Sequence, residues 1–108
     1  MLAIKRKSTS AEKSPQVKSS KQIERHMKGV ANYRRIEIMF LIADNEGISV
    51  ENIARKLRCN TKTISGHLFR LMHAGLIRKS SRGLEVAHEL SPYGKIFHKF
   101  LVSFRYLK

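Results

Sequence analysis

The stretch at residues 60–75, NTKTISGHLFRLMHAG, constrains the fold of this chain more than any other segment. Its apolar side chains recur at helical spacing, at Ile64, Leu68, Leu71 and Met72. A period of about 3.6 places them on one side of an α-helix, for which Asn60 is a suitable N-cap and Gly75 a suitable left-handed end. The opposite side is polar and cationic, without an acidic residue. An ordinary amphipathic surface helix is one interpretation; we favour a recognition helix that lies in a DNA major groove.

The charge of the whole chain favours a polyanionic partner. Twenty-two Lys and Arg residues oppose eight Asp and Glu residues, and the formal net charge is +14. The acids are unevenly placed, because between Asn52 and Leu84 there are eight basic residues and no acidic one. Phosphates release counterions when Lys and Arg dock against them, so this gap predicts binding to nucleic acid. An anionic membrane is the weaker alternative, since the basic N-terminal segment lacks the apolar face of a membrane-surface helix.

Length and composition indicate one small domain. A chain of 108 residues with 42% hydrophobic residues can bury a modest core. No apolar run approaches the roughly 20 residues of a membrane span, and no secretory hydrophobic segment follows Met1. Cys59 is the only cysteine, so an intrachain disulfide is excluded. We therefore expect a soluble, nucleoid-associated protein of the reducing cytoplasm, with no membrane partner.

Residues 1–20 are rich in Lys, Ser and Thr and show no sustained apolar period. They cannot bury enough apolar surface to offset the entropy of ordering, so the composition predicts a disordered basic arm. Such an arm either follows a phosphate backbone or minor groove, or only solubilises the chain, and the sequence favours neither role. Residues 21–108 are expected to form the folded domain.

Three helices are predicted before the recognition helix. The first spans residues 21–28 and stops near Gly29, and the second follows the N-cap Asn32. The second helix is apolar on so much of its circumference that it should be central and buried. Ser49 caps the third helix, and a three-residue turn at residues 58–60 joins it to the fourth. A turn this short makes the two helices cross steeply, as in a helix-turn-helix.

A β-hairpin is predicted directly after Gly75. Residues 76–79 and 84–89 alternate roughly between apolar and polar side chains, as a half-buried hairpin does. The tip between them is small, polar and basic, and is interpreted as a turn of Ser80, Ser81, Arg82 and Gly83. The position favours a wing beside the helix-turn-helix, with an ordinary surface hairpin as the alternative. The wing residues expected to meet nucleic acid are Lys79, Ser80, Ser81 and Arg82.

The last helix begins at Ser91 and Pro92, a serine N-cap followed by proline at the first helical position. Apolar side chains recur along it at three and four residues, and five of the eight aromatic residues lie between Tyr93 and Tyr106. A helix of about 17 residues, at roughly 1.5 Å each, is longer than so small a domain needs. We therefore predict a dimerisation helix over residues 91–108. Its expected contacts with a second subunit are Tyr93, Phe97, Phe100, Leu101 and Phe104.

Together these elements form a mainly α (α+β) fold, a winged helix-turn-helix of about five helices with a two-stranded β-hairpin wing. From about Met27 to Leu101 the chain resembles the ArsR-like family of winged-helix transcription regulators. Three stretches carry the resemblance, and their matching residues are Val30, Ala31, Asn32, Arg35, Ile38 and Met39; Ile48, Ser49, Val50, Ile53, Ala54 and Leu57; and Thr63, Ile64, Ser65, His67, Leu68, Leu71 and residues 74–77. The last stretch is typical of winged-helix regulators in general and separates ArsR-like from MarR-like relatives less well.

The resemblance implies a homodimer whose recognition helices enter successive major grooves of a palindromic duplex, with half-site centres about 34 Å apart. The residues it implies in the groove are Thr61, Lys62, Thr63, Ser65 and Gly66, with Arg70 directed to the backbone and His67 beside a phosphate. The sequence departs from the family twice, because Gly66 replaces a long polar side chain and Phe69 replaces a polar one. These departures favour fewer base contacts and more recognition by backbone, shape and the thymine methyl group.

No metal, cofactor or catalytic site is expected. A sulfur site needs at least two cysteines, and the histidines lack partners at ligand spacing. The family's metal site needs an Asp two residues before the wing histidine, but Val86 precedes His88, and the last helix offers only His98. A redox role for Cys59 stays open beside a purely structural one. No glycine-rich phosphate loop, close acid pair or nucleophile with a base is present, which argues against an enzyme.

The sequence therefore predicts a homodimeric, sequence-specific double-stranded DNA-binding transcriptional regulator that represses by occluding its site. Phosphate attraction is assigned to Lys62, Arg70, Lys79 and Arg82, and base-edge contacts to Thr61, Thr63 and Ser65. Two alternatives remain open. One is a non-specific architectural DNA- or RNA-binding protein, and the other is a winged-helix protein-interaction module that binds through Phe69 and the last helix.

Overall fold

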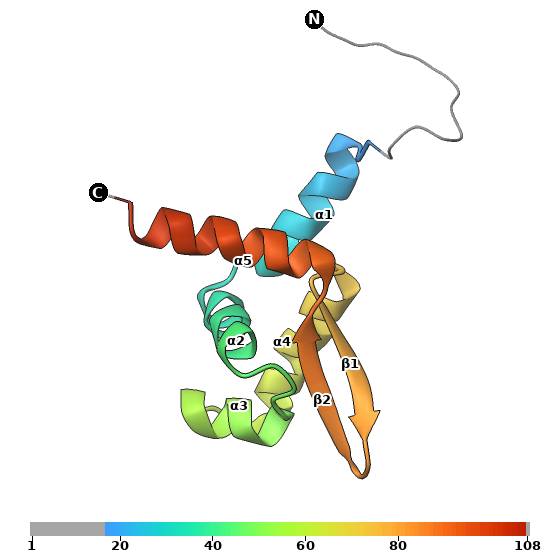
Figure 1. Cartoon of the computed structure of the whole chain (residues 1–108), viewed down its shortest axis with the longest axis vertical. Helices are drawn as coiled ribbons and strands as arrows, with labels where there is room; N and C mark the ends of the chain where they lie inside the picture. Colours follow the sequence, from blue (N-terminus) through green and yellow to red (C-terminus); the bar gives the residue numbers. More distant parts are fainter. Residues whose placement is uncertain (1–16, 108) are drawn as a thin grey trace, which may run out of the picture.

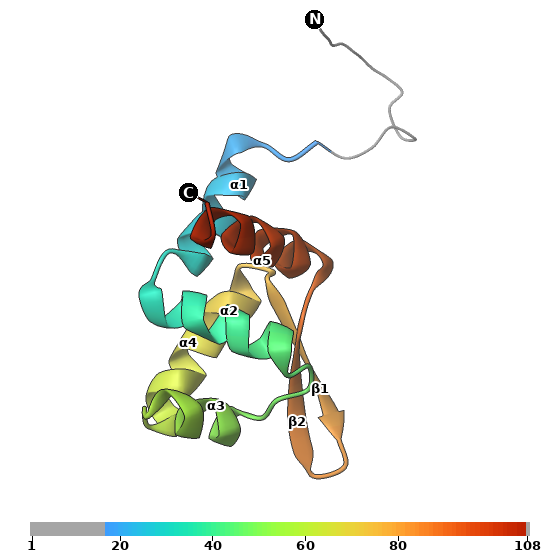
Figure 2. The same cartoon turned by 60° about the vertical axis from the view of Figure 1, so that its left-hand side comes forward.

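Five helices and a two-stranded hairpin make up residues 17–107, the part of the chain that the computed structural model describes (Figure 1). In chain order they are α1 (Ser20–Val30), α2 (Tyr33–Asp44), α3 (Val50–Leu57), α4 (Thr61–His73), β1 (Ile77–Arg82), β2 (Glu85–Leu90) and α5 (Pro92–Arg105). Helices α1 and α5 lie at one end of the molecule, while α3 and the tip of the hairpin lie at the other (Figure 2). The predicted winged helix-turn-helix is confirmed.

Helix α1 begins one residue before position 21, at Ser20. The predicted arm falls mostly on residues 1–16, which lie outside the described residues. Ser19 already caps α1 in a capping box: its hydroxyl accepts from the backbone N–H of Gln22, and the Gln22 side-chain oxygen accepts from the backbone N–H of Ser19 at 2.8 Å. Two free donors of the first turn are satisfied in this way, which fixes the start of α1 at Ser20.

The predicted helix starts are confirmed, because the cap side chain accepts backbone N–H groups of the first turn in all four cases, Asn32, Ser49, Asn60 and Ser91. Each cap contributes about 1 kcal/mol to stability. The recognition helix also ends as predicted, with Ala74 as its cap and Gly75 at φ +76°, a conformation that favours glycine.

The core lies where α2 meets the helix-turn-helix. Its largest fully buried side chains come from α2, α3, α4 and the start of the wing, and are Ile38, Met39, Ile42, Ile53, Ile64, Leu71 and Leu76. Burying one such side chain contributes about 1.5–3 kcal/mol. The central position predicted for α2 is confirmed. Within residues 17–107, every helix is too short or too polar to cross a membrane.

Helix α1 packs closely on α4 through Gly29. The sequence predicted a stop near this glycine, but α1 runs on to Val30. A Cβ atom placed on Gly29 would overlap the Cβ atom of Ala74, so the missing side chain lets the two backbones approach. Gly29 therefore serves helix–helix packing within α1.

Three hydrogen bonds from two neighbouring elements hold the C-terminal end of α4. The N–H at Nδ1 of His26 in α1 donates to the carbonyl of Ala74 at 2.6 Å. The Ser91 hydroxyl, at the start of α5, donates to the carbonyl of Gly75 at 2.6 Å, and the Ser91 backbone N–H donates to the carbonyl of Leu76 at 3.0 Å. Residues 74–76 are thus fixed to both α1 and α5, and we call this segment the α4 junction.

The wing closes through a shorter turn than predicted. Strands β1 and β2 are antiparallel, and their pairing runs from Ile77 opposite Leu90 to Arg82 opposite Glu85. Only Gly83 and Leu84 remain in the turn, so the predicted four-residue turn at residues 80–83 is wrong. Gly83 has φ +66° while Leu84 does not have a positive φ, which fits a type II′ turn. Ser80, Ser81 and Arg82 consequently belong to β1.

Candidate nucleic-acid interface

The N-terminal half of α4 presents an open polar face. Thr61, Lys62, Thr63, Ser65 and Gly66 are all exposed, whereas the apolar side of the same helix is buried in the core. The turn before α4 sets this orientation, because Arg58 adopts a left-handed conformation (φ 57°) and the backbone N–H of Cys59 donates to the carbonyl of Ala54 at 3.0 Å. The predicted groove residues therefore share one surface.

Gly66 is the last residue of this surface along α4 and has no packing reason to be glycine. No atom would come within 4 Å of a Cβ atom placed there, and its φ lies outside the left-handed region. The backbone at Gly66 is thus open to a close approach from outside, as a base edge or sugar would make.

His67 lies at the edge of the surface and turns toward α2. Its ring is half-buried, and Nδ1 accepts a hydrogen bond from a guanidinium N–H of Arg35 at 3.3 Å. Burial lowers the pKa of His67, and the charges of Arg35, Arg34 and Arg70 lower it further. A neutral imidazole already bonded to Arg35 is a weak phosphate ligand, so the predicted phosphate contact at His67 has less support than the others.

Arg35 joins three helices at this point. Its Nε–H donates to the carbonyl of Gly29 at 2.6 Å, while its other end reaches His67 on α4. Burial and the nearby charge of Arg70 lower the pKa of the Arg35 guanidinium, which nevertheless stays charged. Arg35 was predicted as part of the family pattern, but its long-range partners depend on how α1, α2 and α4 pack.

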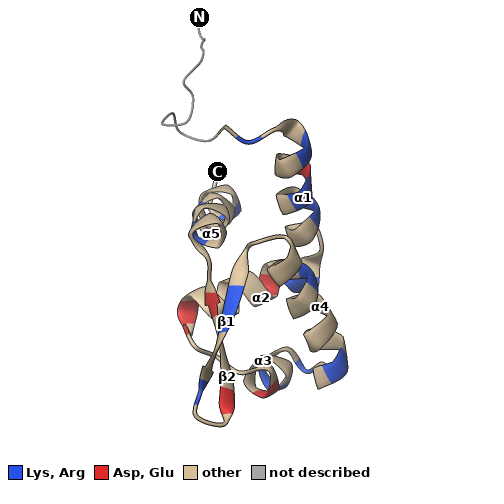
Figure 3. Cartoon of the chain, turned by 90° about the vertical axis from the view of Figure 1, so that its right-hand side faces the viewer, with Lys and Arg blue, Asp and Glu red and all other residues tan. Residues whose placement is uncertain are grey.

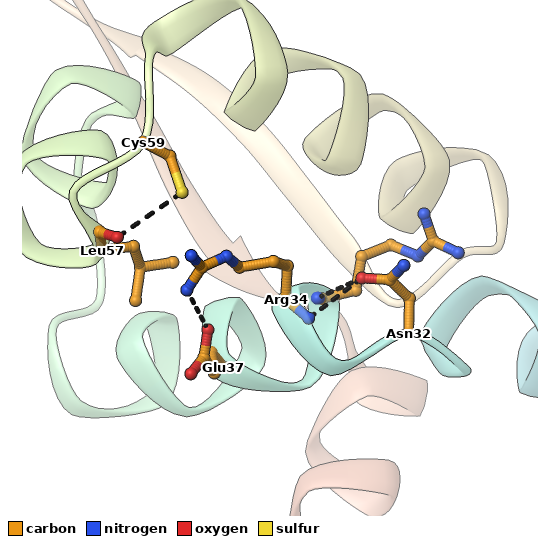
Figure 4. Close-up of polar contacts among 6 residues, drawn as sticks. Asn32, Arg34, Glu37, Leu57 and Cys59 are labelled. Carbon is orange, nitrogen blue, oxygen red and sulfur yellow. Dashed lines mark hydrogen bonds and ion pairs between the residues drawn. The ribbon is translucent and has the colours of Figure 1, made fainter.

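The start of α2 lies against the helix-turn-helix turn (Figure 4). Asn32 caps α2, and Arg34 forms an ion pair with Glu37 at 2.9 Å. The hydrogen bond from the Arg34 guanidinium to Glu37 is the main reason why the pKa of Arg34 is raised. Across from them, the half-buried thiol of Cys59 donates to the carbonyl of Leu57 at 3.5 Å. This contact fits a structural thiol.

The wing residues are exposed but face two ways. Lys79, Ser80, Ser81 and Arg82 are consecutive in β1, so alternate side chains point to opposite faces of the hairpin. Arg82 bonds to Glu89 of β2 at 3.4 Å, a pair that depends on the strand register and that the sequence prediction missed. The cationic surface of the wing is therefore partly neutralised on one face.

Charges divide by element across the molecule (Figure 3). Helix α4, strand β1 and helix α5 carry basic residues and no acidic residue, whereas acids lie on α1, on α2, on α3 and on β2 of the wing. The helix-turn-helix surface that α4 presents, with Lys62 and Arg70, is thus acid-free.

The residues predicted for a dimer contact divide into two groups. Tyr93, Phe100 and Phe104 are exposed at 45%, 55% and 67%. Phe97 and Leu101 are partly buried against the core of their own chain, so they are at least partly intrachain contacts. Helix α5 also has 14 residues where about 17 were expected. The prediction missed Ile23 and Ile96, exposed apolar side chains that line one hollow with Tyr93 and Phe97; Met27 of α1 is exposed as well.

Two of the histidines that lack a metal-ligand partner in the sequence are buried. His26 and His88 are each 4% exposed and donate from Nδ1 to main-chain carbonyls, of Ala74 and Ile48 respectively. No cluster of three metal-ligating side chains occurs in the described part of the chain. Both histidines therefore fasten elements of the fold together.

Helices α2, α3 and α4 with the following hairpin define a winged helix-turn-helix domain, the fold of a large class of DNA-binding transcriptional regulators. Residues 32–82 of the chain match the model of the MarR family. The match covers the helix-turn-helix and the first strand of the wing. Among curated proteins, no sequence gives a significant match.

Several solved winged-helix structures are similar to this chain in fold. A homodimeric winged helix-turn-helix DNA-binding domain from Mycobacterium bovis, a possible ArsR-family transcriptional regulator, is 29% identical over 79% of this chain and 80% of its own, with a TM-score of 0.71. The transcriptional regulator HlyU from Vibrio vulnificus is 28% identical over 82% and 91%, with a TM-score of 0.69. The transcriptional repressor PagR of Bacillus anthracis is 22% identical over 75% and 93%, with a TM-score of 0.68, and shows the fold alone. All three similar structures are of transcription regulators or possible transcription regulators.

Proposed function

We propose that this protein is a homodimeric, sequence-specific double-stranded DNA-binding regulator of the ArsR-like branch, which represses transcription by occluding its site. The observation that carries the proposal is the open, acid-free face of α4 at residues 61–66, beside a cationic wing. Such a face fits a major groove, which admits one helix and attracts Lys and Arg through its phosphates. A regulator of this kind acts on the nucleoid, in the cytoplasm.

Each residue that we assign to the duplex has a role that matches its chemistry. Lys62, Arg70, Lys79 and Arg82 attract phosphates and set the register of the protein on the duplex. The short hydroxyl side chains of Thr61, Thr63 and Ser65 reach base edges, and the threonine methyl groups suit thymine. The open backbone at Gly66 lets the helix approach the bases closely.

An apolar face on α1 and α5 supports the homodimer. Ile23 and Met27 of α1 and Tyr93, Ile96 and Phe100 of α5 leave large apolar side chains in water, and Phe104 continues this face toward the C-terminus. Contiguous apolar surface of this kind marks an interaction site on a small protein. A second copy of the chain covers it with the same face, as a two-fold contact requires. The Mycobacterium bovis domain, which is similar over most of its length, is homodimeric.

Selection of bound sequences from a random duplex pool, with the solution mass recorded alongside, tests the proposal. We expect a palindromic site with half-site centres about 34 Å apart. The protein should prefer this site to random duplex by roughly 10³-fold or more. Enrichment without any consensus would instead favour an architectural DNA- or RNA-binding protein, and weak duplex binding at low salt would favour a protein-interaction module.

The dimer contact is tested separately by Phe104→Glu. A charge buried in an apolar contact is costly, so the variant should sediment as a monomer at concentrations where the natural chain is dimeric. Leu84→Glu is the matched control, because Leu84 is fully exposed on the wing and lies outside the α1–α5 face. A dimeric Phe104→Glu variant would remove α5 from the proposed interface.

A further inference from the structure

A second cationic surface lies away from the N-terminal half of α4. Beside the point where Gly29 packs on Ala74, α1 and α4 enclose an open groove of about 390 Å³. Its walls are formed by Arg25 and Lys28 of α1 and by Phe69, Arg70 and His73 of α4. We call it the α1–α4 groove.

Phe69 gives this groove an aromatic face. Its side chain is 60% exposed, and its ring stacks on that of His73 with centroids 5.7 Å apart and an angle of 20° between the planes. A large apolar side chain on the outer face of a helix does not contribute to the core. The outer face of the Phe69 ring is therefore available to a planar ligand group.

Cations stand on both walls of the groove. Among residues 17–107, Lys28 pairs with Glu24 at 3.3 Å, while Arg25 and Arg70 have no ion-pair partner. Lys21, Arg25 and Lys28 follow one another at four and three residues, which aligns them along one side of α1. A chain of negative groups lying in the groove would meet Arg25 on one wall and Arg70 on the other, both free of ion pairs among residues 17–107, and would compete with Glu24 for Lys28.

The groove adjoins the surface proposed to read a duplex and shares Arg70 with it. Phe69 is not assigned to the duplex; it follows Gly66, the last of the α4 residues at 61–66, by three residues, about 4.5 Å along the helix axis at roughly 1.5 Å per residue. Bases inside a duplex are stacked on each other and cannot offer a ring face to Phe69, whereas unpaired bases can. Aromatic faces combined with cations that follow the backbone are the features by which proteins bind single strands.

We propose that the α1–α4 groove binds single-stranded nucleic acid, with one base stacked on Phe69 and neighbouring phosphates on Arg25, Lys28 and Arg70. This site goes beyond the proposed duplex-binding function and does not depend on it. It gives the exposed phenyl ring, which departs from the polar residue usual in ArsR-like recognition helices, a physical role.

Fluorescence anisotropy with the full chain and a labelled oligothymidine of about 12 nucleotides tests the proposal. Phe69→Ala should weaken binding of the strand at least about five-fold, since stacking is lost, and Phe69→Tyr, which keeps the ring, should not. Arg70→Ala should lower the salt slope for the single strand by about 0.7. Lys62→Ala is the matched control, because it removes a cation from the same helix outside the groove.

Duplex binding by the same variants separates the two surfaces. We expect Phe69→Ala to leave binding of a selected duplex unchanged and Lys62→Ala to weaken it. Equal binding of the strand by the natural chain and Phe69→Ala would overturn the proposal. Tighter binding of a labelled Asp- and Glu-rich peptide carrying one Trp, lost in Phe69→Ala, would also overturn it and assign the groove to a protein partner.

Discussion

Replacing Gly66 with alanine should stabilise the fold and weaken duplex binding at the same time. Gly66 is the sixth residue of the 13-residue helix α4, an interior position where glycine costs about 1 kcal/mol relative to alanine. Alanine recovers that cost in full only if its methyl group makes no steric clash. Apart from the adjacent backbone of α4, no atom lies within 4 Å of the position of this methyl group. The expected gain in the free energy of unfolding is therefore about 0.8–1 kcal/mol.

Urea and thermal denaturation at one fixed protein concentration measure this gain. For a domain of this size, 1 kcal/mol corresponds to a rise in Tm of about 4–8 °C. Gly29→Ala and Gly94→Ala are matched controls of opposite sign. Their new Cβ atoms would overlap the Cβ atom of Ala74 and the carbonyl oxygen of Leu76 respectively. Overpacking of this kind costs about 1–3 kcal/mol.

The duplex measurement completes the test, because the same methyl group would stand between α4 and the DNA. We expect Gly66→Ala to bind the selected duplex less tightly than the natural chain despite its greater stability. An unchanged or lower Tm would refute the reasoning that Gly66 is free of packing. A higher Tm with unchanged duplex affinity would remove Gly66 from the DNA-facing surface.

Three further predictions concern charge. Lys62→Ala should weaken binding to all duplex sequences and reduce the salt slope by about 0.9; an unchanged slope contradicts the docking of α4. Glu89→Gln should release Arg82 from its ion pair and strengthen duplex binding at low salt, with Glu85→Gln as a control on the same strand; equal effects of both would point to net charge alone. His67→Gln should reduce the loss of stability in acid. Burial and the charges of Arg35, Arg34 and Arg70 lower the folded-state pKa of His67 below 6.5. As the pH falls through 6.5, the unfolded chain therefore binds more protons than the folded chain, and the free energy of unfolding decreases. Identical pH profiles of unfolding for the variant and the natural chain would contradict this.

Local signals were sufficient to predict most of the fold. A cap side chain acts within three residues of itself, so Asn32, Ser49, Asn60 and Ser91 marked helix starts correctly. The apolar period of α4 likewise assigned its buried and exposed sides, and the polar residues expected at the DNA are exposed apart from His67, which is half-buried. Capping and apolar periodicity depend on residues that are close in the chain, so both can be predicted from the sequence alone.

Contacts between distant segments could not be predicted in the same way. Gly29 appeared to end a helix because its partner, Ala74, lies 45 residues further on. Arg82 lies opposite Glu85 and pairs with Glu89, which is on the same face of β2, and this arrangement depends on the two-residue turn that sets the register. His26 could not be recognised as buried, because its carbonyl partner is brought to it only when α1 packs on α4.

The α4 junction fixes the C-terminal end of the recognition helix to α1 and to the start of α5. Its end is held by hydrogen bonds of 2.6 Å from His26 on α1 and from Ser91 at the start of α5. In a dimer joined through α5, a rotation of one α5 against the other would move the two recognition helices with them as rigid bodies and change the distance between them. The distance between half-sites would then be set by the subunit contact, so operator spacing could evolve through residues that never touch DNA.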